Sequence, residues 1–186
     1  MARAQAQQRT RDALLDAANE ELSTGGWSKA SLETLAAKAG VTKQTVLRHF
    51  GSREGLIEAA LRRASEIVRK ERAQSPIGDV PGAVRNLMDH YERWGDLVLR
   101  VLAEEHRIPL VRKGTDRGRE VHCEWVARTF EPQLANLSDE MRERRMAQLV
   151  AVCDVYVWKL LRRDMKLDVP QAKIALIELI EGLEAD

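Results

Sequence analysis

Residues 42 to 53 contain a dense run of side chains that can bind nucleic acid. Glutamine, threonine and arginine hydrogen-bond base edges from the major groove, and basic side chains attract phosphate. If this run is helical, Val46 and Phe50 share one face because they are four residues apart. Gln44 and Arg48 then project from the opposite face. The spacing therefore predicts a short helix with one buried side and one hydrogen-bonding side.

The residues around this run predict two short helices joined by a tight turn. Ser31 is a suitable N-cap for a helix over 32–39, and Gly40 ends that helix. Thr42 is a suitable N-cap for the next helix, over 43–49. Two helices separated by only about three residues must cross steeply, as in a helix-turn-helix.

Longer helices are expected on both sides of this pair, over 9–23 and over 53–72. Gly25 and Gly26 are expected to end the first of them. Basic residues before it form either an arm that contacts the DNA backbone or minor groove, or a frayed terminus: Arg3, Arg9 and Arg11.

The stretch from Ser31 to Leu56 resembles the DNA-binding signature of TetR-family transcriptional repressors. The resemblance is specific over roughly residues 9–60 and extends in length and layout to the whole chain. The positions that match are Ser31, Leu35-Ala36, Ala39-Gly40-Val41, Thr45, His49-Phe50, Ser52-Arg53-Glu54 and Leu56.

Side-chain chemistry and the resemblance together assign roles to this region. The base-edge candidates are Lys43, Gln44, Thr45 and Arg48, and the phosphate candidates are Ser31, Thr42, His49 and Arg53. His49 lies near the inward side of its helix, so a packed core histidine is the alternative for that residue. The alternative for the whole region is a structural helical hairpin with a solvated polar face.

Three positions depart from the family pattern. Leu47 stands where the family usually has a tyrosine that contacts phosphate, and leucine cannot donate that hydrogen bond. Arg53 replaces the more usual lysine and preserves a phosphate contact. Glu33 stands where a neutral or basic residue is common, and its charge would repel the DNA backbone.

Composition predicts an all-α protein with two parts. Hydrophobic residues make up 44% of the 186 residues and aromatic residues only 4%, which favours packed helices over a β-sandwich or barrel. Residues 1–75 contain 13 basic and 9 acidic side chains, whereas 76–186 contain 17 and 20. Because the segment 73–82 has two prolines and two glycines, it marks the boundary. We expect a DNA-binding domain over 1–52, a linking helix over 53–72, and a regulatory and dimerisation domain over 73–186.

The second part is expected to contain five further helices, giving about nine in total: 82–93, 94–106, 113–134, 139–163 and 170–183. The last two are apolar on two faces, which predicts one face in the subunit core and one against a second subunit. The resemblance implies the same, because TetR-like proteins dimerise through their final two helices. The interface candidates are Val157, Leu161, Leu176, Ile177 and Ile180.

Repressors of this family commonly hold a small-molecule inducer in this second part, so the resemblance implies a similar site here. The candidate lining residues are Met88, Tyr91, Trp94, His122, Trp125 and Cys153, and their alternative is an ordinary core. Few aromatic and many aliphatic residues suggest an apolar effector. Together with these residues, the resemblance implies a dimeric, ligand-released repressor of a palindromic operator. The alternative is a helical DNA-binding or adaptor protein without a small-molecule ligand.

Other classes of protein find little support in the sequence. It has no glycine-rich phosphate loop and no nucleophile motif, so an enzyme is not expected. The histidine spacings match no metal-ligand motif, Cys123 and Cys153 fit apolar helices better than redox sensing, and no metal or cofactor is expected. No stretch approaches the ~18 apolar residues of a membrane-spanning helix, and we expect a soluble cytoplasmic protein.

Overall fold

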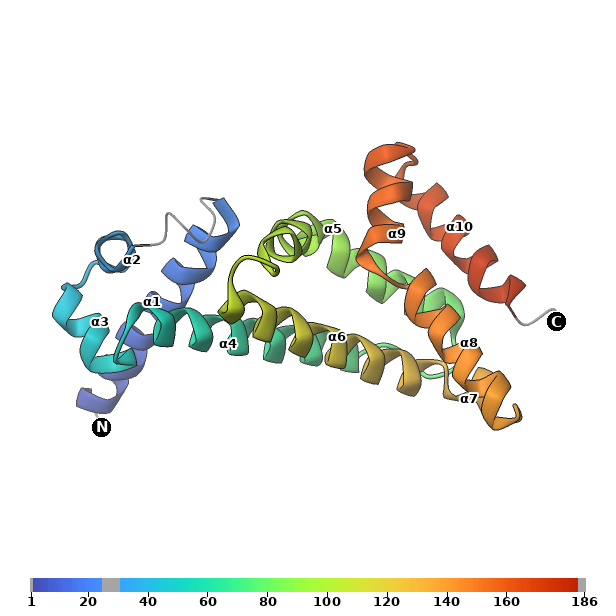
Figure 1. Cartoon of the computed structure of the whole chain (residues 1–186), viewed down its shortest axis with the longest axis horizontal. Coiled ribbons are helices and arrows are strands. Elements are labelled where there is room, and N and C mark those ends of the chain that lie inside the picture. Colours follow the sequence, from blue (N-terminus) through green and yellow to red (C-terminus); the bar gives the residue numbers. More distant parts are fainter. Residues whose placement is uncertain (1, 25–30, 184–186) are drawn as a thin grey trace. The chain divides into compact units, whose positions relative to one another are not determined.

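The computed structural model describes residues 2–24 and 31–183, and every regular element in these ranges is helical. This confirms the prediction of an all-α chain with an N-terminal helix-turn-helix. The helices, labelled in Figure 1, are α1 (Ala2–Thr24), α2 (Leu32–Lys38), α3 (Lys43–Phe50), α4 (Arg53–Ala73), α5 (Val80–Glu104), α6 (Pro109–Thr129), α7 (Glu131–Leu134), α8 (Asp139–Val152), α9 (Val155–Lys159), the π-helical segment η1 (Leu160–Asp164) and α10 (Val169–Gly182).

The chain forms two compact units that alternate along the sequence. The first unit takes residues up to 66 together with 100–117, and the second takes 67–99 together with residues from 118 onward. Three long helices, α4, α5 and α6, therefore each contribute residues to both units.

In the first unit, α1, α2, α3 and the start of α4 enclose one apolar core. The small side chain of Ala36 is buried in it, so α2 approaches its neighbours closely. The core consists of Leu14, Leu15, Ala18, Leu32, Leu35, Ala36, Val46, Leu56, Ala59 and Ala60. A smaller cluster of the same unit places Ile57 of α4 against Val111 of α6.

The first helix starts earlier than the sequence predicts. Because α1 begins at Ala2, the basic residues expected in an N-terminal arm lie on a helix instead. Gly25 and Gly26, the predicted end of this helix, lie outside the described residues.

The break expected between 93 and 94 is absent, and α5 is continuous from Val80 to Glu104. Gly95 sits inside this helix, where a Cβ atom would come within 2.4 Å of the Trp158 ring. This glycine therefore allows a close helix–helix approach and does not end a helix.

The helix expected over 139–163 is interrupted. Asp154 leaves the helical conformation, with ψ 153°, and its Oδ1 accepts a hydrogen bond of 2.9 Å from the Tyr156 amide. It is thus the N-cap of α9, a break the apolar pattern alone does not reveal because the apolar residues continue on both sides.

In the second unit, an ion pair and a ring fix α9 and η1 to α5. Glu92 binds the Arg162 guanidinium in two parallel contacts of 2.7 and 2.9 Å and accepts a 2.8 Å hydrogen bond from the Trp158 indole. Trp158 itself is fully buried. Because such bidentate pairs fix orientation as well as distance, the last helices are held rigidly on α5.

Candidate functional site

The helix α3 is capped at both ends by local sequence. Thr42 accepts the Thr45 amide at 3.2 Å, as a threonine N-cap should. Gly51 ends the helix with φ 75°, a conformation that favours glycine. Val46 has no exposed surface and fixes the inward side of the helix in the core of the first unit. The orientation of α3 is therefore determined by packing and not by a ligand.

Three of the four residues predicted to contact base edges lie on the exposed side of α3. Lys43, Gln44 and Arg48 are exposed, as is Leu47 with 41% of its surface. Among the described residues Gln44 and Arg48 make no hydrogen bond or ion pair, so both are available to a base edge or phosphate. Thr45, the fourth, is half-buried, and its hydroxyl lies 3.0 Å from that of Thr42.

Lys43 is not free, because it pairs with Glu33 of α2. Its ammonium nitrogen lies 2.6 Å from the Glu33 carboxylate, and both side chains are exposed. The hydrogen bond from Lys43 lowers the pKa of Glu33, which therefore stays ionised. The acidic residue that departs from the family pattern is thus neutralised within the protein.

Three of the four residues predicted to contact phosphate lie at helix starts, and the fourth, His49, lies on α3. Ser31 caps α2 by accepting the Thr34 amide at 3.0 Å, and Thr42 caps α3. Arg53 opens α4 and pairs with Glu54 at 3.2 Å. His49 is half-buried, and the centre of its ring lies 6.2 Å from that of Phe50.

Arg11 holds α3 in place in a way that the sequence analysis did not predict. Its guanidinium carbon lies 4.8 Å from the centre of the Phe50 ring, a cation–π contact between α1 and α3. Arg11 therefore helps to hold the last residue of α3 against α1. In the sequence, only its place among the basic residues before the first expected helix singled it out.

Five of the six predicted effector residues fall in the second unit's interior. Met88, Tyr91, Trp125 and Cys153 are buried, and His122 is half-buried with its ring stacked on Trp125 at 5.9 Å. Tyr91 donates a hydrogen bond of 3.1 Å to the Cys153 carbonyl. The sixth, Trp94, is 38% exposed and does not join them.

Burial shifts the pKa of three titratable side chains in this interior. It raises the pKa of the Tyr91 hydroxyl and of the Cys153 thiol to about 12 each, so both stay protonated at neutral pH. Burial also lowers the pKa of His122. Its Nε2 lies 3.1 Å from the Val150 carbonyl, which only accepts, so Nε2 carries the proton and Nδ1 keeps a lone pair.

The charged centre of this interior is Arg72, which was not among the predicted site residues. Only 4% of its surface is exposed, and its guanidinium lies 4.4 Å from the Trp125 ring centre and 5.2 Å from that of Tyr91. Among the described residues, its Nη1 has no hydrogen-bonding partner. No local pattern marks it, since the aromatic rings that bury it come from distant parts of the chain.

The predicted dimer residues divide into two sets. Leu176 and Ile180 are buried within the chain, with 1% exposed, so they belong to its own core and cannot form an outer face. Val157, Leu161 and Ile177 are half-buried. On α10, Leu176 and Ile180 lie on the face that packs inward, whereas Ile177 lies beside that face.

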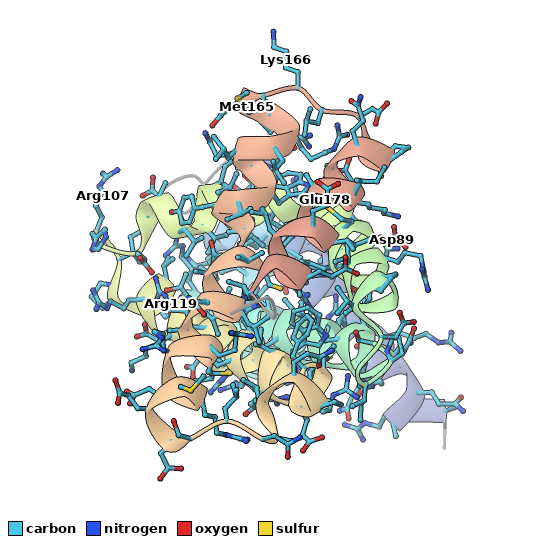
Figure 2. The ribbon with its side chains drawn as sticks, turned by 90° about the vertical axis from the view of Figure 1, so that its right-hand side faces the viewer. Asp89, Arg107, Arg119, Met165, Lys166 and Glu178 are labelled. Atoms are coloured by element: carbon cyan, nitrogen blue, oxygen red, sulfur yellow. The ribbon has the colours of Figure 1, made fainter. Side chains whose placement is uncertain are left out.

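The last helices and the turn between them expose five large apolar side chains. These are Tyr156 (57%), Leu160 (50%), Met165 (64%), Ile174 (55%) and Leu179 (47%). Figure 2 shows Met165 and Lys166 at the turn between η1 and α10, where Lys166 takes φ 58°. Such a concentration of exposed apolar residues is typical of a protein–protein contact.

The described residues contain no group of three or more His, Cys, Asp or Glu placed to hold a metal ion. None of the helices between residues 2 and 183 is long and apolar enough to cross a membrane.

Residues 14–60 match a family model described as "Bacterial regulatory proteins, tetR family". The HTH-type transcriptional regulator AlkX of Mycobacterium tuberculosis is 44% identical over 59 residues, which are 31% of this chain and 28% of that protein. The HTH-type transcriptional repressor LfrR of Mycolicibacterium smegmatis is 36% identical over 101 residues, 53% of this chain and 52% of LfrR. The chain thus spans about a quarter and about half the length of these curated relatives.

Solved structures resemble the chain over nearly its whole length. A transcriptional regulator from Rhodococcus sp. Rha1 has a TM-score of 0.71 at 17% identity, covering 93% of this chain and 95% of its own. The multidrug binding protein EbrR, complexed with malachite green, has a TM-score of 0.62 at 21% identity, covering 93% and 96%. Likenesses at this identity establish the fold.

Proposed function

Because the chain belongs to the TetR family of bacterial regulatory proteins, we propose that it is a transcriptional repressor that binds an operator through α3. The observation that carries this proposal is the exposed side of α3. Gln44 and Arg48 stand there without partners among the described residues, on a helix fixed by Thr42, Val46 and Gly51. A rigid helix with unpaired amide and guanidinium groups suits the major groove.

The proposed contacts are of two kinds: some side chains contact base edges, and others contact phosphates and position the protein on DNA. Arg48 favours guanine and Gln44 favours adenine, since each can form two hydrogen bonds to that base. Lys43 and Thr45 add contacts at the start of the helix, while Ser31, Thr42, His49 and Arg53 bind phosphates and set the register.

The proposed assembly is a homodimer through the last helices. The exposed apolar side chains of α9, η1 and α10 support it, because an unpaired surface of this kind is costly in water. A two-fold pairing would present two copies of α3 to half-sites ~34–36 Å apart, and so would recognise a palindromic operator.

The proposed regulation is release from DNA by a small molecule bound in the second unit. EbrR is described as a multidrug binding protein and LfrR as a repressor, and both resemble this chain. The buried aromatic residues Tyr91 and Trp125 are the supporting feature of this chain itself. By linkage, such an effector must bind more tightly to the form that does not bind the operator.

A helical DNA-binding or adaptor protein without an effector is the second candidate. Under that reading the buried aromatic residues are ordinary core. The two readings differ in one measurement: whether small molecules raise the melting temperature of the protein and weaken its binding to DNA.

The functional division that we propose follows the chain: DNA binding over 1–52, a linking helix over 53–72, and regulation and dimerisation over 73–186. The compact units cross this division, since residues 100–117 belong with the first unit. A repressor acts on chromosomal DNA, so we place the protein in the cytoplasm, without a catalytic role or cofactor.

The experiment that tests this function is selection of genomic fragments by the purified protein, followed by footprinting. We expect one or a few sites with two inverted half-sites, and binding that weakens steeply as salt rises. Recovery of unrelated fragments, or binding insensitive to salt, would contradict the proposal.

A further inference from the structure

Arg72 is a buried positive charge that pairs with no acidic side chain in residues 2–24 and 31–183. Charged side chains are almost never this deeply buried unless they are paired. The neighbouring Glu71 is engaged elsewhere, at 3.0 Å from His90 and 3.0 Å from Arg93. The charge of Asp154 also affects the pKa of His122 in this interior. Its carboxylate caps α9, however, and among the described residues it forms no ion pair with Arg72.

Part of the cost of burying Arg72 is offset by its surroundings. Its guanidinium lies over the rings of Trp125 and Tyr91, and it belongs to the last turn of α4, where the helix dipole favours a cation. Neither contribution satisfies Nη1, which is buried and has no partner in the part of the chain that the structure describes. A buried charged donor of this kind favours an anionic acceptor.

Other unpartnered polar atoms lie on the side of α6 that contacts Arg72. His122, Trp125 and Thr129 are three and four residues apart and therefore share one face of the helix. The indole Nε1 of Trp125, the hydroxyl of Thr129 and the Nδ1 of His122 are buried and have no hydrogen-bonding partner within the described ranges. Trp125 and Thr129 are 3% and 0% exposed.

We propose that Arg72 anchors the carboxylate of a small organic acid whose apolar body lies among the aromatic residues of the second unit. This inference rests on the proposed regulation by an effector and names its chemical class. The planar guanidinium fork matches a carboxylate, with Trp125 Nε1 as an additional donor. One positive charge calls for one negative charge, which favours a monocarboxylate over a phosphate dianion.

This inference revises the effector expected from the sequence. The few aromatic and many aliphatic residues suggested an apolar molecule, and the buried side chains of Met88 and Tyr91 still suit the body of the ligand. Arg72 adds a requirement for a charged end. An uncharged molecule of the same shape would leave Nη1 without a partner.

The test is calorimetry of the full-length protein, without DNA, against carboxylates and their uncharged amides. The pairs are benzoate with benzamide, 1-naphthoate with 1-naphthamide, and hexanoate with hexanamide, at up to millimolar concentration. We expect at least one carboxylate to bind about tenfold or more tightly than its amide. Equal binding within every pair, or no binding by any carboxylate, overturns the proposal.

Variants separate a ligand-binding role from a structural one. Arg72→Met should abolish the preference for the carboxylate and leave the melting temperature of the free protein equal or higher, because an unpaired buried charge is replaced by an apolar group. Arg85→Met, at an arginine with a 61% exposed side chain, should change neither quantity. Trp125→Phe keeps the ring but removes Nε1, and should weaken carboxylate binding severalfold even if Arg72→Met does not fold.

Calorimetry and DNA binding together distinguish failure of the carboxylate site from failure of the proposed repressor function. Carboxylate binding with no operator binding would reject the repressor and keep the site. If the protein binds the operator but binds acids and amides equally, the repressor function is kept and the carboxylate site is rejected.

Discussion

Lys43 of α3 and Glu33 of α2 form an ion pair of 2.6 Å across the turn of the helix-turn-helix. The pair joins the first residue of the recognition helix to the first turn of the preceding helix. It also cancels one positive charge on the surface proposed to meet DNA. A phosphate must therefore compete with Glu33 for the Lys43 ammonium group.

Replacing Glu33 with glutamine should strengthen binding to all DNA. The variant Glu33→Gln removes the competing carboxylate and its repulsion of phosphate, so Lys43 becomes available. We expect affinity for operator and non-operator duplexes to rise together, and the slope of log K against log salt to steepen by about one. Fluorescence anisotropy over a series of salt concentrations measures both.

Glu58→Gln is the matched control, because Glu58 pairs with Arg62 at 2.9 Å within α4 and lies outside α2 and α3. It should change the salt slope little. If Glu33→Gln left the salt dependence unchanged, Lys43 would not contact phosphate in the complex.

Removing Arg48 should reduce specificity more than general affinity. Its exposed guanidinium has no partner among the described residues, so Arg48→Ala loses only contacts made to DNA. We expect a loss of ~1–3 kcal/mol of discrimination at one base pair per half-site. Competition with operators changed at single positions measures this, with Arg112→Ala of α6 as control. A uniform loss over all sequences would instead make Arg48 a phosphate contact.

Tyrosine at position 47 should increase affinity without changing sequence preference. Leu47 is exposed on α3 but cannot donate a hydrogen bond. Leu47→Tyr supplies a hydroxyl for phosphate, and we expect tighter binding by about threefold to tenfold, or ~1 kcal/mol. Leu47→Phe adds the ring without the hydroxyl and serves as control. An altered preference at a thymine position in both variants would show that Leu47 reads a base.

The helix-turn-helix could be predicted from sequence because its signals are local. Ser31 and Thr42 were expected as N-caps and both accept the amide three residues on. Val46 was expected to point inward and is fully buried. Caps and four-residue spacing act over one or two turns, so the sequence carries them directly.

The contacts that tune the sites could not be predicted in this way. The partner of Lys43 lies ten residues away, across a turn whose angle the pattern does not specify. Arg72 has the sequence context of an ordinary basic residue at a helix end, and only the rings of Tyr91 and Trp125 reveal that it is buried. Trp94, three residues from Tyr91 on α5, turned out to be partly exposed because Gly95 and Trp158 occupy the inner side there.

A charge on the outer apolar surface should separate the proposed dimer. Leu160→Glu and Leu179→Glu each place a carboxylate among exposed apolar residues, so we expect monomers in sedimentation and weaker operator binding. Ile77→Glu, at a residue 57% exposed outside these helices, should leave the dimer intact. Leu176→Glu should unfold the chain instead, because Leu176 is in the core. Dimers that persist in both surface variants would place the interface elsewhere.

His90 should make the protein less stable in mild acid. Burial, reinforced by the charge of Arg72, lowers the pKa of His90 from 6.5 to about 4. The unfolded chain therefore takes up this proton first: the stability contribution is complete above pH 6.5 and is lost as the pH falls towards 4, by up to ~3 kcal/mol. Urea unfolding at several pH values should show a smaller acid loss in His90→Asn, and no change in His106→Asn, whose histidine has a 77% exposed side chain. Equal acid sensitivity in all three proteins would assign the effect to other groups.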